Sequence, residues 1–581
     1  MKSLLKVFTI LTRQQLWRCG GLVLAMLVGA VLESAGIGAI LPLISIMGKP
    51  DFLQTHPEIA KWAFFLGADT HSKFIMLCAM GLIGVYVLKN LYLAWQARVQ
   101  IRFVMENQIY YTRQLFAEYL AKPYLYYLNH NTAEANYNIQ SPGTVFSGIL
   151  LPTLMLMTEV ITGAVILGTI ILVDPVMAII VAGFMGSVVY GLFLTFRNMV
   201  SRLGKIQNKC LVLEIKWINQ GLQSIKDTKI LRREAFFCDE YENASRQRGD
   251  AECKYSFTGQ LPRFFIETIV VTGLLLLIIG KIGMGGAPEE IVPVLGLLAM
   301  AAFRLMPGAN RIIGYLNAIK YQMPRFYQVY EELLEVKRRT EQGAAGAFFP
   351  PDPVRLPFDR ELRIEHLGFR YPTGKGEVLS DVSFAVSKGS FVGIVGPSGA
   401  GKTTFVDILL GLLPPDKGKI TADGVSIYDN IRAWQVNLAY VPQSIYLIDG
   451  SVRDNVALGR PEDEIDDVRI EHVLRMAELY DFVRDLPEGI NTSVGDRGVR
   501  LSGGQRQRIG IARALYCQPE VLVLDEATSA LDNETEKSIT DTILKLKGQI
   551  TIIAIAHRVS TLEACDFKVR FEDGRASIVQ E

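Results

Sequence analysis

The residues from Gly396 to Thr403, which run Gly-Pro-Ser-Gly-Ala-Gly-Lys-Thr, have the types and the spacing that bind phosphate groups. They follow an apolar run at 390–395 that predicts a buried strand, and they precede a helical run at 404–413. This spacing lets glycine N–H groups surround phosphate oxygens at a helix N-terminus, where Lys402 reaches the β- and γ-phosphates and Thr403 reaches Mg²⁺. We therefore predict a nucleoside triphosphate site. Its expected binding residues are Gly396, Ser398, Gly399, Gly401, Lys402, Thr403 and Thr404.

A second candidate for chemistry is the run Val-Leu-Val-Leu-Asp-Glu at 521–526. The four apolar residues predict a buried strand, whose tip can present Asp525 to Mg²⁺ and Glu526 as the general base for an attacking water. An apolar run that ends in two carboxylates is also a common strand end in proteins of many kinds. Because this run follows the phosphate-binding residues by about 120 positions, we favour the catalytic interpretation.

The run Leu-Ser-Gly-Gly-Gln at 501–505 lies between these two motifs. Together with Tyr371, Gln443, Ser-Ala-Leu-Asp at 529–532 and His557, it resembles the ATP-binding domain of ABC transporters across residues 361–581. The resemblance implies ATP and Mg²⁺ as cofactors. It also implies that Tyr371 stacks on adenine, that Gln443 links Mg²⁺ to a membrane domain, and that His557 touches the γ-phosphate. Taken singly, a tyrosine, a glutamine or a histidine is more often structural. The expected catalytic residues are Glu526, His557 and Gln443.

In that family the Leu-Ser-Gly-Gly-Gln residues open a helix whose N-terminus faces the γ-phosphate held by the opposite subunit. Ser502, Gly503, Gly504 and Gln505 are therefore expected to complete the nucleotide site of a second chain. Since this chain carries one set of motifs, the resemblance to half-transporters implies a homodimer with two composite sites. The stretch at 492–498 departs from the exporter pattern, because Ser493 and Asp496 stand where glutamates are usual, which puts its contacts across the dimer in doubt.

The elements that must position these motifs include membrane helices. Half of the residues are hydrophobic, and the apolar stretches lie mostly before residue 320. A helix of about 20 apolar residues crosses a bilayer. Six segments are at least that long, and the predicted spans lie near 19–47, 74–104, 143–172, 175–200, 261–283 and 290–318.

The lysines and arginines of 197–259 predict that this stretch is cytoplasmic. An even number of spans then places the N-terminus and the ATP-binding domain in the cytoplasm. The segments 105–142 and 197–259 contain few Gly or Pro residues, so we expect the membrane helices to continue into the cytosol. Their tips, at 124–136 and 218–228, match the places where the exporter family has short helices docked on ATP-binding domains.

The sequence predicts three consecutive regions. Residues 1–337 form the transmembrane domain, 338–360 a linker rich in Gly, Ala and Pro, and 361–581 the ATP-binding domain. In the last region short apolar runs alternate with helical stretches, as in a nucleotide-binding α/β sheet. The predicted fold class is thus a six-span α-helical ABC exporter domain with a cytoplasmic α/β P-loop ATP-binding domain.

Charge and cysteine content exclude several other classes of protein. The net charge is +1, so no basic field favours nucleic acid as a partner. The seven cysteines form no CxxC pair and have no histidines at metal-ligand spacing, which predicts free thiols in a reducing compartment. Polar residues interrupt the first apolar run, so we expect no secretory signal, and residues 2–17 fit an amphipathic helix on the membrane surface.

Candidate substrate residues are the arginines of the predicted spans, because a cation in mid-bilayer is costly, about 3 kcal/mol on insertion scales. Arg304 and Arg311 lie seven positions apart on nearly one helix face, and Arg263 adds a third cation. A guanidinium suits phosphate through two parallel hydrogen bonds. The alternative is that these side chains extend to the cytoplasmic headgroups or pair with Glu267 or Glu159.

Two stretches, 32–43 and 220–234, resemble the bacterial lipid-linked oligosaccharide flippases of N-glycosylation, the PglK type. That subfamily has a short external helix between spans one and two. Here the segment Pro57–Leu66 would supply it, with Ile59, Trp62, Phe65 and Leu66 as an apolar face toward a polyprenyl tail. Packing at the outer membrane interface explains the same residues equally well.

The resemblances predict an ATP-hydrolysing homodimeric exporter in the bacterial inner membrane. Its expected cargo is a polyprenyl-pyrophosphate glycan, flipped from the cytoplasmic to the outer leaflet. Drugs, other lipids or peptides are alternative cargoes of the same machine. A membrane protein that senses nucleotide without pumping is the alternative of another class, although Glu526 and His557 are both of the hydrolytic type.

Overall fold

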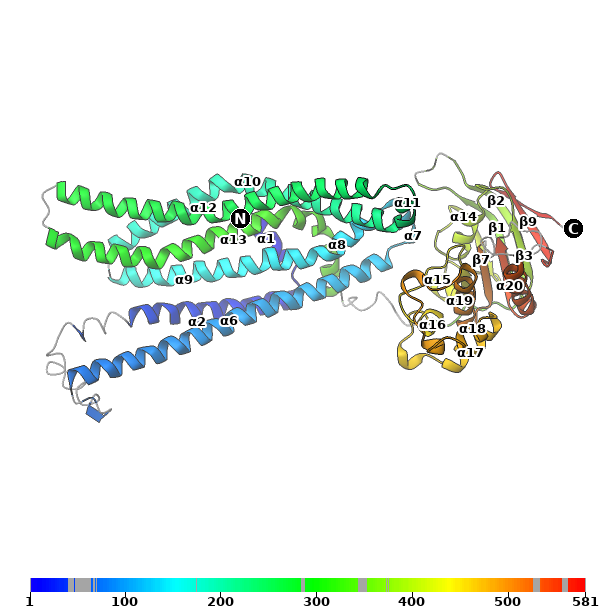
Figure 1. The fold of residues 1–581 in the computed structure, drawn as a ribbon, viewed down its shortest axis with the longest axis horizontal. Coiled ribbons are helices and arrows are strands. Elements are labelled where there is room, and N and C mark those ends of the chain that lie inside the picture. Colours follow the sequence, from blue (N-terminus) through cyan, green and yellow to red (C-terminus); the bar gives the residue numbers. More distant parts are fainter. Residues whose placement is uncertain are drawn as a thin grey trace. The chain divides into compact units, whose positions relative to one another are not determined.

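The computed structural model divides into two compact units (Figure 1). Unit 1 comprises Met1–Lys122 and His130–Phe349, and unit 2 comprises Pro123–Asn129 and Pro350–Glu581. Unit 2 is therefore not one continuous stretch of chain. The described residues are 2–39, 46–47, 64–65, 68, 70–173, 175–283, 288–342, 353–372, 374, 376–525, 533–555 and 563–579.

Unit 1 is built from long helices that run side by side (Figure 1). Its elements are α1 (Lys2–Thr9), α2 (Arg13–Gly38), α6 (His71–Ala121), α8 (Thr132–Val145), the π-helical turn η1 (Phe146–Leu150), α9 (Leu151–Val173), α10 (Pro175–Gln223), α11 (Ile225–Ile230), α12 (Glu234–Gly283) and α13 (Pro288–Glu341). Helix α6 has 51 residues and is therefore about 75 Å long, more than twice the hydrocarbon thickness of a bilayer. The expected continuation of the helices beyond a membrane-spanning length is present.

Three helical segments among the described residues are long and apolar enough to cross a membrane, namely Arg13–Gly36, His71–Ala121 and Ala133–Thr169. They overlap the spans predicted near 19–47, 74–104 and 143–172 and differ from them in their bounds. The spans predicted at 175–200, 261–283 and 290–318 fall in α10, α12 and α13. Some side chains of these three helices lie outside the described part of the chain, so these spans stay predictions. The predicted external helix Pro57–Leu66 lies almost wholly outside the described residues.

Helices α10 and α13 approach each other closely at a glycine. A Cβ atom on Gly204 would lie 2.0 Å from the carbonyl oxygen of Tyr321. Beside this point the rings of Tyr255 on α12 and Tyr321 stack with centroids 3.8 Å apart. The absence of a side chain at Gly204 thus allows α10, α12 and α13 to pack as one group.

The N-terminal helix packs on this bundle. Val7, Ile10 and Leu11 are buried in one cluster with residues of α6 and α13. The hydroxyl of Tyr111 on α6 donates to the carbonyl oxygen of Ile10. The apolar residues of the predicted surface helix 2–17 therefore contact the protein itself, and the helix is interrupted between Thr9 and Arg13.

Unit 2 combines two sheets with short helices (Figure 1). The antiparallel sheet has the order β2 (Leu379–Ser387), β1 (Glu361–Phe369), β4 (Lys417–Ala422), β5 (Val425–Ser426). The second sheet has the order β10 (Arg575–Val579), β9 (Phe567–Glu572), β3 (Phe391–Val395), β8 (Thr551–Ile555), β7 (Val521–Asp525), β6 (Leu438–Val441). The helices are α7 (Tyr124–Asn129), α14 (Lys402–Leu409), α15 (Ile431–Gln435), α16 (Val452–Val456), α17 (Asp467–Met476), α18 (Tyr480–Arg484), α19 (Gly503–Tyr516) and α20 (Asn533–Leu546).

The parallel strands of the second sheet bring the predicted motifs to one edge. Strands β3, β7 and β8 are almost continuously apolar and buried, as expected for parallel strands covered on both faces. Ile394 and Asp525 each pair with Ile555, and Val441 pairs with Leu524. The carboxyl ends of β3, β8, β7 and β6 therefore lie at the same edge of the sheet, where ligands of such sheets bind.

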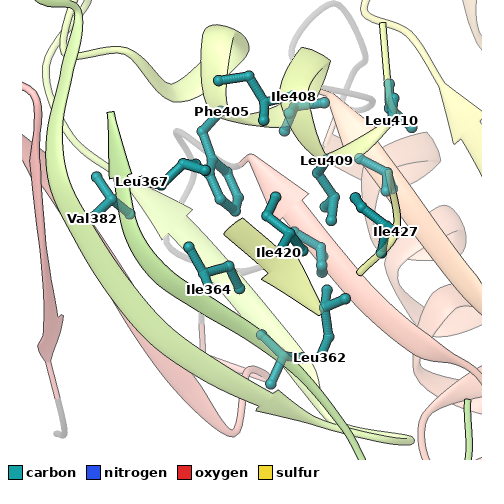
Figure 2. Close-up of a cluster of buried hydrophobic side chains, with 14 of the residues drawn as sticks. Leu362, Ile364, Leu367, Val382, Phe405, Ile408, Leu409, Leu410, Ile420 and Ile427 are labelled. Carbon is teal, nitrogen blue, oxygen red and sulfur yellow. The ribbon is translucent and has the colours of Figure 1, made fainter. Parts of the chain in front are cut away.

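A buried apolar cluster joins the antiparallel sheet to α14 (Figure 2). Leu362 and Ile364 of β1 and Ile420 of β4 face Phe405 and Ile408 of α14. This core fixes the helix that begins at Lys402. Helix α7 also contributes to it, because its Leu125 packs against the same cluster.

Candidate nucleotide site and helical-unit cavity

The turn between β3 and α14 has a backbone that only glycines adopt easily. Gly396, Gly399 and Gly401 have φ values of +148°, +82° and +95°. At Gly396 a Cβ atom would also lie 2.2 Å from the carbonyl oxygen of Phe571. The predicted phosphate loop is thus a tight glycine-dependent turn whose chain leads directly into a helix N-terminus.

Lys402 points back over this turn. Its side chain is 6% exposed, and its ammonium donates to the carbonyl oxygens of Gly396 at 2.7 Å and Pro397 at 2.9 Å. No ion pair of Lys402 is found in the described part of the chain. A buried cation held by neutral carbonyls in a glycine turn is well suited to an anionic phosphate.

The neighbouring threonines have different surroundings. Thr403 is exposed on the first turn of α14, while Thr404 is buried. The hydroxyls of Thr404 and Tyr371 lie 3.2 Å apart, and the Tyr371 ring packs edge to face on Phe369. The structure therefore brings Tyr371 next to the phosphate-binding helix. Ser398 is exposed at the tip of the turn.

Asp525 ends β7 with its side chain 8% exposed. The hydroxyl of Tyr440 on β6 donates to its Oδ2 atom at 3.2 Å. Burial and then the charge of Asp525 raise the pKa of Tyr440, which keeps the hydroxyl protonated as a donor. Burial, followed by the same charge, raises the pKa of Asp407 on α14 to about 6. Tyr440 and Asp407 were not predicted, because no local motif marks a residue that meets Asp525 only through the sheet.

The residues present fit a magnesium site formed together with a nucleotide. Thr403 offers a hydroxyl, Asp525 a carboxylate, and Gln443 is exposed just beyond β6 at the edge where β7 ends. Within the described ranges there is no group of three His, Cys, Asp or Glu residues that could hold a metal ion by protein side chains alone. Mg²⁺ commonly takes one or two carboxylates and completes its shell with phosphates and water.

The two remaining predicted catalytic residues, Glu526 and His557, lie outside the described residues. In sequence they come directly after β7 and shortly after β8, which are neighbours in the sheet. The catalytic roles of these two residues therefore stay predictions.

The Leu-Ser-Gly-Gly-Gln motif forms the N-terminus of α19. Ser502 is the N-cap residue: its hydroxyl accepts from the N–H of Gln505, while the Gln505 side chain accepts from the N–H of Ser502. Gly503 is exposed, and no atom lies within 4 Å of the place of its missing Cβ. Gly504 completes the first turn. The motif is thus a pre-formed helix N-terminus with open space in front of it.

Unit 1 contains a cavity of about 610 Å³ between α2, α9, α10 and α13. Most of its wall is apolar, and its charged lining residues among those described are Glu33, Glu159 and Arg311. The guanidinium of Arg311 pairs with the carboxylate of Glu159 at 2.6 and 3.1 Å. Pairing with Glu159, which the sequence left open as the alternative for this arginine, is therefore present.

Of the three predicted substrate arginines, one is among the described residues that line the cavity. Arg311 lines the cavity, whereas Arg263 is exposed on α12 and is not among the described lining residues. The side chain of Arg304 lies outside the described part of the structure. Glu159 and Glu33 make the cavity less cationic than the predicted arginine stripe. The sequence offered Glu159 only as one of two possible partners of the arginines, because a separation of 152 positions does not show which residues meet.

Comparison with known proteins supports the two-part organisation. Residues 379–529 match the family model described as ABC transporter. An "ATP-dependent lipid A-core flippase" of Cupriavidus pinatubonensis is 37% identical over 312 residues, covering 50% of this chain and 53% of the relative. An "ABC multidrug transporter MDR1" of Cryptococcus neoformans is 42% identical over 220 residues, covering 37% and 16%. The chain thus spans about half the length of the flippase relative.

A solved structure titled "Structure of a bacterial Atm1-family ABC exporter with ATP bound" matches nearly the whole chain. The match covers 94% of this chain and 95% of the other with a TM-score of 0.71, at 24% identity. It shows the fold of both units, and the predicted fold class is confirmed. The chain therefore has the fold of an ABC exporter, with one helical unit and one α/β unit, and residues 379–529 of the α/β unit match the ABC transporter family model.

Proposed function

We propose that this chain hydrolyses ATP as a homodimer and uses the energy to flip a lipid-linked oligosaccharide. The cargo would move from the cytoplasmic to the outer leaflet of a bacterial inner membrane, with the N-terminus and unit 2 in the cytoplasm. The observation that carries the proposal is that one chain combines a glycine-built phosphate site with a large, mostly apolar cavity that contains a guanidinium.

Each residue of the nucleotide site has a distinct task in this proposal. Lys402 exchanges the loop carbonyls for phosphate oxygens, and Thr403, Gln443 and Asp525 hold Mg²⁺. The metal supplies positive charge that neutralises the β- and γ-phosphate oxygens. Tyr440 keeps the Asp525 carboxylate oriented by its hydrogen bond. Glu526 takes the proton of the attacking water, and His557 contacts the γ-phosphate, as the family resemblance implies.

The open N-terminus of α19 supports the dimer. Its dipole and N–H groups favour an anion, and the space before Gly503 leaves room for one. In the family the anion is the γ-phosphate bound to the opposite subunit. Two identical chains would then form two equivalent sites.

The cavity of unit 1 supports an amphiphilic cargo. Its volume of about 610 Å³ lies within the usual range of ligand pockets, and its walls suit a hydrocarbon or a sugar face. Arg311 adds a cation for a phosphate group. The flippase relative is named for a lipid cargo, lipid A-core, which favours an amphiphile of the lipid class.

A cationic amphiphile is the second candidate cargo. Among the described lining residues two carboxylates, Glu33 and Glu159, face one guanidinium, which leaves a formal charge of −1. A relative named as a multidrug transporter agrees with this class.

The test is the ATPase activity of the purified chain in nanodiscs, with and without a polyprenyl-pyrophosphate oligosaccharide. We expect the lipid to stimulate hydrolysis and Glu526→Gln to abolish both basal and stimulated rates. Stimulation by a cationic amphiphile alone would replace the lipid-linked cargo by the second candidate. Absence of any hydrolysis in the wild-type protein would favour a nucleotide sensor that does not pump.

A further inference from the structure

The ion pair in the cavity of unit 1 joins two helices that are distant in sequence. Glu159 lies on α9 and Arg311 on α13. The Nε and one terminal nitrogen of the guanidinium donate to the two carboxylate oxygens at 2.6 and 3.1 Å. This two-pronged arrangement is the one in which a guanidinium also binds a phosphate group.

The two partners differ in how far they reach into the cavity. The side chain of Arg311 is 50% exposed, and that of Glu159 is 18% exposed. No hydrogen bond of Arg311 other than the two to Glu159 occurs in the described residues. A guanidinium has five N–H donors, so three of them have no hydrogen-bond partner among the described residues. The arginine is therefore the more accessible partner of the pair.

We propose that Glu159 is a displaceable counter-ion, which holds Arg311 in the empty cavity and gives up the guanidinium to the phosphate of a lipid headgroup. This inference rests on the proposed function, since it assigns a role to the same cavity. A pyrophosphate carries more negative charge than a carboxylate and presents the same pair of acceptors. It can therefore compete for the guanidinium, which a neutral ligand cannot.

The surroundings of Glu159 leave room for this exchange. Gly308 lies one turn before Arg311 on α13, and its missing Cβ would be 3.6 Å from a carboxylate oxygen of Glu159. A glycine here leaves the carboxylate space to rotate. Glu33 lines the same cavity and acts electrostatically on Arg311. Its negative charge weakens the hold on a bound anion, and a carrier that must release its cargo needs such moderate affinity.

The exchange also has a structural result. In the empty cavity the ion pair links α9 to α13. When the headgroup takes the guanidinium, that polar link is broken, while the apolar packing of α9 on α13 remains. Headgroup binding would then change the contacts between the helices that border the cavity.

A counter-ion and a purely structural ion pair predict opposite effects of removing Glu159. If the pair only holds the helices together, Glu159→Gln and Arg311→Gln both weaken cargo binding. If Glu159 competes with the cargo, Glu159→Gln strengthens binding and Arg311→Gln weakens it. The sign of the Glu159→Gln effect therefore separates the two roles.

The experiment measures direct binding to the full-length protein in nanodiscs of zwitterionic lipid. The probes are polyprenyl pyrophosphate, polyprenol of the same length, phosphatidic acid, inorganic pyrophosphate and a cationic amphiphile. We expect Glu159→Gln to bind polyprenyl pyrophosphate about fivefold more tightly, the gain from losing one partly exposed competing ion pair. Arg311→Gln and the double variant should both bind it more weakly than the wild type, and none of the variants should change polyprenol binding.

Two further variants serve as controls. Glu267→Gln removes an exposed carboxylate of α12 that is not among the described cavity residues, and it should leave binding unchanged. Should Arg311→Gln fail to fold, Arg311→Lys keeps the charge without the two-pronged geometry and should bind the pyrophosphate lipid more weakly than the wild type. Tightening seen also with phosphatidic acid and inorganic pyrophosphate would support the phosphate chemistry without selection by the tail.

Equal weakening by Glu159→Gln and Arg311→Gln would overturn the counter-ion role. Equal binding of the pyrophosphate lipid by all variants would also overturn it, while the proposed cargo would stand with a site elsewhere. If no variant bound that lipid, and Glu159→Gln weakened a cationic amphiphile, both the inference and the proposed cargo would be wrong. ATP hydrolysis dependent on Glu526 would separate that result from an inactive preparation.

Discussion

Gly396 is restricted twice, by its φ of +148° and by the carbonyl oxygen of Phe571, which a Cβ would approach to 2.2 Å. Gly399 shares only the positive φ, of +82°, and has open space where a Cβ would lie. We expect Gly396→Ala to abolish nucleotide binding because the turn cannot form. Gly399→Ala should cost only the backbone strain, about 1–2 kcal/mol. Titration with a fluorescent ATP analogue checks this order, and equal losses would contradict it.

Ser502 has both a structural and a proposed functional task, and the chain offers a matched control. Ser451 forms the same type of capping box, with Asp454 at the start of α16. Ser502→Ala and Ser451→Ala should each lose about 1 kcal/mol of helix stability. Only Ser502→Ala is expected to lower the ATPase rate strongly, because only that helix N-terminus would face a phosphate. Measurements of thermal stability and ATPase rate on both variants distinguish the structural from the functional task. Similar ATPase rates of Ser502→Ala and Ser451→Ala would contradict a role of Ser502 in the nucleotide site.

Asp407 makes the stability of unit 2 depend on pH. Burial, and next the charge of Asp525, raise its pKa from 3.8 to about 6 in the folded protein. Between about pH 4 and pH 6 the folded chain keeps a proton that the unfolded chain has lost, so stability falls as the pH rises. At pH 7.5 the full penalty, on the order of 2–3 kcal/mol, is present. Asp407→Asn should remove it and flatten the pH dependence.

Hydrogen exchange of the α14 amides at pH 5 and pH 7.5, corrected for intrinsic rates, measures this effect. The variant should be better protected than the wild type at pH 7.5, and the difference should shrink at pH 5. Protection that is unchanged at pH 7.5 would show that the ionised carboxylate carries no such cost.

At the scale of elements, the contact between α10 and α13 depends on Gly204. A Cβ there would lie 2.0 Å from the backbone oxygen of Tyr321, which cannot move without its helix. We expect Gly204→Ala to destabilise unit 1 by about 1–3 kcal/mol, as in other overpacked interiors. Gly249→Ala on α12 is the control, because no atom lies within 4 Å of its missing Cβ and alanine favours helix. The midpoint temperature of thermal unfolding, measured in nanodiscs, should fall for Gly204→Ala and not for Gly249→Ala.

Sequence patterns predicted these elements where the deciding information is local. The run at 396–403 contains its own strand end, turn and helix start, and the apolar residues of 521–524 are buried as a parallel strand. Both the fold class and the phosphate loop follow from such short stretches. Contacts between distant positions were not predictable in this way. Tyr440 meets Asp525 across 85 positions because two strands are neighbours, and no spacing rule connects them.

The same limit explains the difference at the cavity. A seven-residue spacing on one helix predicted a stripe formed by Arg304 and Arg311. Which residue on another helix faces that stripe depends on how the helices pack. Glu159 was therefore only one of two possible partners in the sequence, and the fold selected it for Arg311.

At the scale of the whole molecule, the proposed dimer predicts complementation between two defective chains. Lys402→Ala removes the phosphate-binding cation, and Gly503→Asp places a carboxylate before α19 in space that is otherwise open. If each site combines the loop of one chain with the α19 N-terminus of the other, a mixed dimer retains one intact site. Co-expressed chains should then hydrolyse ATP, while each variant alone is inactive. An inactive mixture would contradict sites shared between two copies.

Unit 2 takes seven residues, Pro123–Asn129, from the middle of unit 1. During synthesis these residues leave the ribosome long before Pro350. Leu125 can therefore pack on its apolar cluster only after the later segment has been made. Residues 350–581 alone leave uncovered the part of the apolar cluster on which Leu125 packs. The ATP-binding unit can therefore be completed only after both the helical segment that carries α7 and the C-terminal segment have been synthesised.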